Sequence, residues 1–200
     1  GVFLTGVIMY YIVDPPATAL NDWMNTTLSN MSGSNIILLG AIVGGMMAID
    51  MGGPINKAAY AFGIAALSAN NPEPITAAMI GGMVPPLAIA VATMVFRNRF
   101  TQVERSSGPT NLIMGASFIT EGAIPFAAAD PLRVIPSMVV GSATAGALAM
   151  AFATTINAPH GGLFVALTIG EGRLMFLLSL LIGTLIAAVI LGLLKKPIKQ

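Results

Sequence analysis

Residues 75–96 read ITAAMIGGMVPPLAIAVATMVF, an apolar run without a single charged side chain. At about 1.5 Å per residue, a helix of this length extends roughly 33 Å, which is enough to cross the bilayer's hydrocarbon core of about 30 Å. Pro85 and Pro86 lie near its middle and predict a kink, because proline has no N–H to donate. The stretch therefore predicts a membrane-spanning helix.

The rest of the chain has the same character. Of its 200 residues, 56% are apolar and only 8% are charged, and the mean hydropathy is +0.85. Soluble domains are about 45–50% apolar and about 25% charged. This composition excludes an ordinary soluble enzyme, a disordered chain and a nucleic-acid binder, which would need a basic face. It predicts an all-α, polytopic helical membrane protein.

Two more spans are predicted, at residues 132–156 and 173–194. The first is rich in Gly and Ala, so that a neighbouring helix can approach it closely. Two apolar helices at 36–49 and 58–69 are each too short to cross a bilayer alone. Between them lies DMGGPINK (50–57), a break of the kind that membrane proteins tolerate only where it lines a cavity or is buried.

A second break lies further along the chain. Residues 111–131 begin as an apolar segment and are interrupted by TEGAIPFAAADP, which predicts a re-entrant hairpin that enters and leaves on one side. NAPHGG (157–162) forms a third break. The first two breaks share an acidic residue with a glycine close behind it and a proline four positions on, and paired broken segments often mark a transporter site.

The N-terminal region is expected to be peripheral. Residues 1–13 are apolar but too short to span, as in the second half of a longer helix. Apolar residues at helical spacing over 17–31 predict an amphipathic surface helix with Trp23 at headgroup level, the alternative being a periodic linker. Residues 1–200 are therefore expected to form one partial membrane transport domain.

The positive charges predict an orientation. Residues 97–110 carry three arginines, and Lys195, Lys196 and Lys199 follow the last span. Positive loops stay in the cytoplasm, so both segments, and with them the C-terminus, are expected there. The topology agrees with this orientation, because the hairpin returns to the cytoplasm, the span 132–156 leads out and the span 173–194 leads back in. Residues 157–162 are then expected on the outer side.

Glu121 is the strongest candidate for chemistry. It lies in FITEGAIPFA, and no basic residue occurs within ten positions of it. A charge at membrane depth costs at least about 2.5–3.5 kcal/mol, so it needs a reason to be there. A carboxylate in a dry cavity can accept hydrogen bonds from substrate hydroxyls or act as a general base. The alternative is a turn residue that caps a half-helix.

The remaining charged residues at membrane depth allow fewer conclusions. Asp50 and Lys57 either pair with each other, or Asn56 and Lys57 point at substrate. Asp130 and Arg133 are three residues apart and are expected to form a structural pair.

His160 is the only histidine, and a lone loop histidine is more often a hydrogen-bonded structural residue than a metal ligand. The chain has no cysteine and no phosphate-binding glycine loop. We therefore expect no metal and no cofactor.

Four stretches together resemble the membrane-embedded C component of a fructose-specific bacterial phosphotransferase system. They are DMGGPINKAAYAFG (50–63), NPEP (71–74), GASFITEGAIPFAAADPLRVIPS (115–137) and NAPHGG (157–162). The resemblance implies an inner-membrane permease that binds fructose outside and releases it inside as a phosphate ester. It implies a homodimer and a cytoplasmic B component whose phosphocysteine is the donor. The chain would then be the permease subunit of a protein-phosphocysteine–fructose phosphotransferase.

The resemblance also implies site residues. The sugar-binding glutamate of a G-I-T-E type segment matches Glu121, with Thr120 beside it, although Phe118 replaces the glycine. Glucose-type relatives use a histidine in an earlier motif, where this chain has Asn56 and Lys57. His160 and Asp50 complete the candidate substrate contacts. The alternatives are a proton- or ion-coupled secondary transporter of a small polar solute, with Asp50 or Glu121 carrying the ion, and a channel or structural subunit.

Overall fold

The computed structural model describes residues 2–13, 15, 18–19, 26, 34–168 and 172–198, and every regular element among them is helical. This confirms the all-α class. The predicted surface helix with Trp23 falls largely outside the described residues. The helical elements are α1 (Val2–Ile8), the π-helical η1 (Met9–Val13), α3 (Ser34–Ile49), α4 (Pro54–Ser68), α5 (Glu73–Val95), η2 (Arg97–Arg99), α6 (Gln102–Ser107), α7 (Thr110–Ala116), η3 (Thr120–Ala123), α8 (Ile124–Ala129), α9 (Pro131–Ala151), α10 (Leu163–Ala166) and α11 (Arg173–Leu194).

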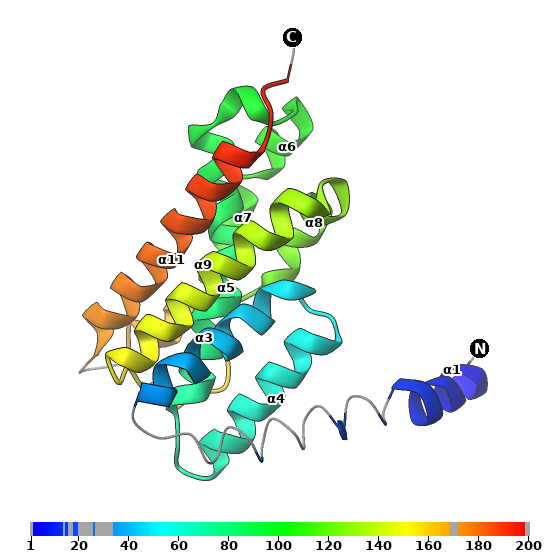
Figure 1. Cartoon of the computed structure of the whole chain (residues 1–200), viewed down its shortest axis with the longest axis vertical. Coiled ribbons are helices and arrows are strands. Elements are labelled where there is room, and N and C mark those ends of the chain that lie inside the picture. The colour runs from blue at the N-terminus through cyan, green and yellow to red at the C-terminus, as the bar shows by residue number, and fades with distance from the viewer. Residues whose placement is uncertain are drawn as a thin grey trace.

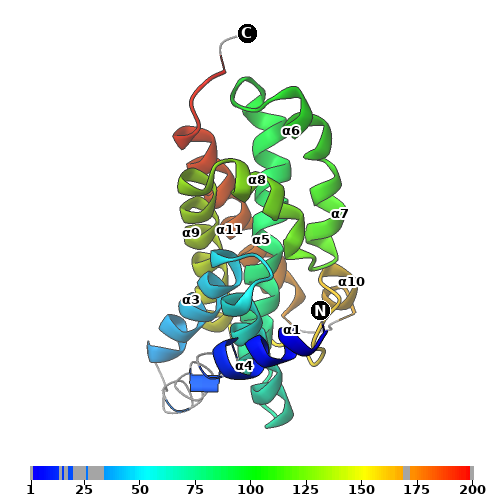
Figure 2. The same ribbon diagram turned by 90° about the vertical axis from the view of Figure 1, so that its right-hand side faces the viewer.

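Three of the described helices, α5, α9 and α11, are long and apolar enough to cross a membrane. They confirm the three predicted spans. Helix α5 is the central one, and α3, α9 and α11 pack around it (Figures 1 and 2). Helix α9 ends at Ala151 rather than at the predicted 156, because Ala153 has a φ of 48° and turns the chain out of the helix.

The proline pair of α5 determines how its neighbours attach. Pro85–Pro86 cannot donate to the carbonyls one turn earlier, those of Gly81 and Gly82. Two hydroxyls from other elements donate to these carbonyls instead: Ser142 Oγ on α9 to Gly81 O at 2.8 Å, and Thr120 Oγ1 on η3 to Gly82 O at 2.8 Å. The prolines thus fix α9 and η3 against the middle of α5.

Small residues allow α3, α5 and α9 to meet closely. Gly44 on α3 faces Gly81 on α5, where an added methyl group would lie 2.6 Å from the Gly44 Cα. Gly146 on α9 also approaches Gly44, and a methyl group added to Gly146 would lie 3.0 Å from the Gly44 Cα. This confirms the close approach expected from the Gly- and Ala-rich span.

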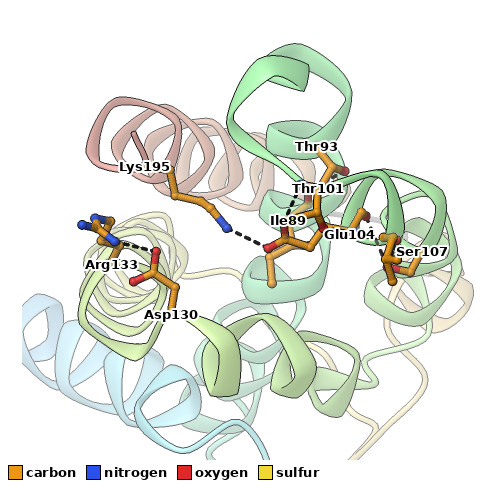
Figure 3. Close-up of polar contacts among 9 residues, drawn as sticks. Ile89, Thr93, Thr101, Glu104, Ser107, Asp130, Arg133 and Lys195 are labelled. Atoms are coloured by element: carbon orange, nitrogen blue, oxygen red, sulfur yellow. Dashed lines mark hydrogen bonds and ion pairs between the residues drawn. The ribbon is translucent and has the colours of Figure 1, made fainter. Parts of the chain in front are cut away.

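The segment before α9 forms the expected hairpin. Helix α7 runs from the end that carries α6 towards the middle of the bundle, η3 turns the chain, and α8 runs back (Figure 2). Asp130 follows α8, and its Oδ2 lies 2.9 Å from Arg133 Nη1 (Figure 3). The predicted structural pair is therefore confirmed.

Both basic segments lie at one end of the bundle. Arg99 Nη1 donates to the carbonyls of Leu193 (3.0 Å) and Lys195 (2.6 Å), and Ile198 N donates to Asn98 O at 2.9 Å. These bonds hold the C-terminal tail to the loop after α5. Figure 1 shows both segments at the same end of the bundle. The two segments therefore lie at the same end of the bundle, as expected, while their cytoplasmic location stays a prediction. Lys199 falls outside the described residues.

An ion pair reinforces this end. Lys195 Nζ lies 2.7 Å from Glu104 Oε1, with both side chains largely buried (Figure 3). Glu104 Oε2 also accepts from Thr101 N, and Thr101 Oγ1 accepts from Glu104 N, so the two residues cap α6. Burial by itself would raise the pKa of the Glu104 carboxyl, but the hydrogen bonds from Lys195 and Thr101 outweigh it and lower that pKa.

Candidate substrate site

The break between α3 and α4 is a tight reversal held by Asp50. Met51 and Gly52 adopt φ values of 48° and 116°. The Asp50 carboxylate then accepts from Ile55 N at 2.7 Å and from Asn56 N at 2.9 Å, the first turn of α4. Both carboxylate oxygens therefore cap the helix. Asp50 forms no ion pair with Lys57 in the described structure, so the alternative in which these two pair is wrong.

The three predicted breaks converge on one cleft of about 60 Å³, which is room for a few water molecules. Every sequence-predicted candidate except Asp50 borders it. The lining residues are Met47, Asn56, Lys57, Tyr60, Phe118, Thr120, Glu121 and His160. Residues from α4, from η3 and from the loop before α10 are thus brought together although they lie far apart in the sequence.

Lys57 and Glu121 lie at the rim of this cleft. Lys57 Nζ is 3.4 Å from Glu121 Oε1, and the side chains are 62% and 46% exposed. An exposed pair of this kind contributes at most about 1 kcal/mol to stability. Glu121 therefore has a cationic neighbour after all, 64 positions away in the sequence. The pair is weak enough for a ligand to replace it.

The first two breaks touch directly at Gly52. A methyl group added there would lie 2.8 Å from Glu121 Oε1. Gly52 has a positive φ that glycine adopts without strain, and it also leaves the space that the carboxylate occupies. Gly53, by contrast, has a φ of −79°. A methyl group on Gly53 would lie 2.6 Å from Asp50 Oδ2, so it leaves room for the cap.

Asn56 and Thr120 are buried, and each is oriented by a backbone carbonyl. Asn56 Nδ2 donates to Met47 O at 2.7 Å, and the Thr120 hydroxyl donates to Gly82 O on α5. Within the described part of the chain, no donor reaches Asn56 Oδ1. The amide oxygen and the Thr120 lone pairs remain available as acceptors for hydroxyl donors.

Three rings form the apolar side of the cleft. The centroids of Phe118 and His160 lie 4.9 Å apart, and Tyr60 lies 6.1 Å from Phe118 and 6.5 Å from His160. Sequence reasoning missed Tyr60, and it noted Phe118 only as a substitution for glycine. That substitution was a usable signal, because Phe118 has a φ of 61°, which suits glycine better than phenylalanine.

The described residues contain no group of three His, Asp or Glu side chains that could hold a metal ion. The cleft instead combines one carboxylate, one ammonium group, amide and hydroxyl groups, and an aromatic wall. This combination suits a small neutral ligand with many hydroxyl groups, because polar groups orient such a ligand and the rings cover its apolar faces.

Similar proteins are known for the whole chain, although no family model and no solved structure matches it. It is 54% identical over 200 residues to the PTS system fructose-specific EIIABC component of Bacillus subtilis, covering 100% of this chain and 31% of that protein. It is 53% identical to the Fructose permease IIC component of Bacillus amyloliquefaciens, covering 65% of that protein.

A more distant relative is the PTS system fructose-specific EIIB'BC component of Escherichia coli, 46% identical over 196 residues, 97% of this chain and 35% of that protein. The chain thus spans between about a third and two thirds of the length of these relatives. What all three names share is the C component. Since the whole chain is similar to proteins that contain this component, the chain belongs to the family of membrane C components of fructose-specific phosphotransferase systems.

Proposed function

We propose that the protein is a fructose permease that binds fructose on one side of the membrane and presents it for phosphorylation by a phosphocysteine on a B component. One observation carries this proposal: Glu121, Lys57 and Asn56 converge on one cleft where the breaks meet. The names of the relatives supply the substrate and the partner, because they include fructose and, in two cases, B components.

Glu121 is proposed to bind and activate the sugar. Its carboxylate accepts hydrogen bonds from sugar hydroxyls, and at transfer it takes the proton of the hydroxyl whose oxygen attacks phosphorus. The new O–P bond forms as the P–S bond of the phosphocysteine breaks, and the thiolate leaves. Lys57 places a positive charge beside the carboxylate, where the phosphoryl oxygens arrive.

The other lining residues are proposed to orient the sugar. Asn56 Oδ1 and the Thr120 hydroxyl accept from sugar hydroxyls, while Phe118 and His160 cover an apolar face of the ring. A hexose is larger than the cleft, so its entry is expected to replace the Lys57–Glu121 contact at the rim. The exposure of both side chains, 62% and 46%, supports this movement.

The energy source of uptake tests the proposal. The full-length protein is placed in sealed membrane vesicles, and fructose uptake is measured with the phosphorylated B component and separately with an uncoupler. We expect uptake that requires the phosphoryl donor and survives the uncoupler. Uptake that needs an ion gradient and no donor would instead support the secondary transporter.

Orientation and assembly are part of the same proposal. Single cysteines at Ser106 and Lys196 are expected to resist an impermeant thiol reagent added to intact cells, because we place that end in the cytoplasm. Labelling of either cysteine from outside would show that the orientation is the reverse of the proposed one. We also propose a homodimer, which a mass measurement on the purified full-length protein would distinguish from a monomer.

A further inference from the structure

A groove at the charged end of the bundle lies apart from the cleft. It consists of two cavities of about 450 Å³ each, and Arg97, Gln102 and Arg105 border both of them. Met94 is among the other residues that line one cavity, and Ile198 is among those that line the other. We call these residues the arginine groove. It is formed where the end of α5, helix α6 and the C-terminal tail come together.

The charges in the groove are unbalanced. Elsewhere at this end, Arg99 donates to the carbonyls of the last turn of α11. Lys195 pairs with Glu104, the one acidic residue of the loop after α5. The side chains of Arg97 and Arg105, in contrast, form no ion pair and no hydrogen bond within the described part of the chain. Two guanidinium groups bordering one groove therefore lack a counter-ion, which favours an anionic ligand.

The surroundings indicate what kind of anion. Met94 and Val95 in the last turn of α5 are 40% and 66% exposed, and Val103 on α6 is 76% exposed. Ile198 on the other side is 44% exposed. The groove thus lies where the apolar surface of a spanning helix ends and the charged loop begins, which is the level of lipid headgroups.

We propose that the arginine groove binds the phosphodiester group of an anionic phospholipid. The planar fork of an arginine donates two N–H groups to phosphate oxygens, which lysine cannot do with the same geometry. The acyl chains would then run along Met94 and Val95. A phosphorylated protein loop would satisfy the arginines equally well, but it would leave these apolar side chains uncovered.

Lipid binding to the purified full-length protein tests this proposal. Phosphatidylglycerol is titrated into the protein in a neutral detergent, and bound lipid is measured by native mass spectrometry. We expect saturable binding, weakened at least tenfold in the double variant Arg97→Gln/Arg105→Gln. Lys196→Gln is the matched control, because it removes a positive charge from the same end without bordering the groove, and it should change affinity less than twofold.

Further arms separate the possible ligands. Phosphatidylcholine and inorganic phosphate should compete poorly with phosphatidylglycerol. The double variant should keep its fructose affinity, which shows that it is folded, and Arg97→Lys/Arg105→Lys should restore only part of the lipid affinity. Equal losses in the double variant and in Lys196→Gln would overturn the proposal. So would full competition by inorganic phosphate, or a preference of the groove for the phosphorylated B component over lipid.

Discussion

In the described part of the chain, two lysine–glutamate pairs join distant segments, and they differ in distance, in exposure and in the number of further bonds. Lys195 and Glu104 lie 2.7 Å apart, with their side chains 10% and 17% exposed. Lys57 and Glu121 lie 3.4 Å apart and are 62% and 46% exposed. The first pair binds the C-terminal tail to α6, and the second stands at the rim of a cleft.

The two pairs also differ in how completely the carboxylate is bonded. Both oxygens of Glu104 are occupied, by Lys195 and by Thr101 N, and Lys195 Nζ also lies 4.5 Å from the centre of the Phe100 ring. The Glu121 carboxylate has no hydrogen-bond partner other than Lys57 among the described residues. A carboxylate with unused acceptor capacity in a cleft is available to a ligand, whereas one that is fully bonded stabilises the fold.

Replacing Glu121 with Gln should have the largest effect on function. The substitution keeps the shape but removes the charge and the basicity, so donor-dependent fructose uptake should be abolished. Fructose affinity should fall at least tenfold, which corresponds to about 1.4 kcal/mol. Radiolabelled uptake and equilibrium binding would measure both, and thermal stability should change little because the pair is exposed. The control is Asp130→Asn, which should affect stability rather than affinity. Normal uptake by a well-inserted Glu121→Gln protein would reduce Glu121 to a structural role.

Replacing Gly52 with Ala should also impair uptake severely. The new methyl group would meet the Glu121 carboxylate, and the φ of 116° would be strained by about 1–3 kcal/mol. We expect both lower thermal stability and weaker fructose binding. Gly6→Ala is the matched control, because nothing lies within 4 Å of a methyl group there. Equal behaviour of the two variants would show that the contact between the breaks is unimportant.

Replacing Glu104 with Gln should lower the stability of the protein and leave fructose binding unchanged. It weakens the bond to Lys195 and the cap of α6, so the free energy of unfolding should fall by about 1–3 kcal/mol. Fructose affinity, measured by equilibrium binding, should stay within twofold. A large loss of affinity without a loss of stability would remove the distinction between the two pairs.

The same pair predicts a pH dependence. The pKa of Glu104 in the folded protein lies below its ordinary value of 4.5, so the folded state binds fewer protons. The stabilisation is therefore fully present above about pH 4.5 and is lost as the pH falls through the lower folded-state pKa. The melting temperature should decline between pH 7 and pH 3, and the decline should be smaller in the Glu104→Gln variant. Parallel curves would contradict this assignment.

The smallest effects are expected from the two hydroxyls that bond to α5. Thr120→Val and Ser142→Ala each remove one hydrogen bond to a carbonyl that the proline pair leaves free, at a cost of about 1 kcal/mol in stability. Only Thr120→Val should also weaken fructose binding, because Thr120 borders the cleft and Ser142 does not. Unfolding and binding measurements on both would show whether this distinction holds.

Much of the architecture follows from local patterns. Length and hydropathy are properties of a continuous segment, so the spans at α5, α9 and α11 were predictable. The breaks around Gly52 and Glu121 were predictable too, because glycine, proline and isolated charges interrupt an apolar helix. Asp130 and Arg133 are three residues apart, and their pairing needs only the geometry of one helical turn.

Which breaks meet, and how, was decided by tertiary structure. Lys57 approaches Glu121 across 64 positions, and Asp50 caps α4 instead of pairing with Lys57. Thr120 and Ser142 reach α5 because its prolines leave two carbonyls without donors. The sequence identifies such unsatisfied groups but not their partners. A partner is selected only when close packing of α3, α5 and α9 through small residues brings distant atoms within bonding distance.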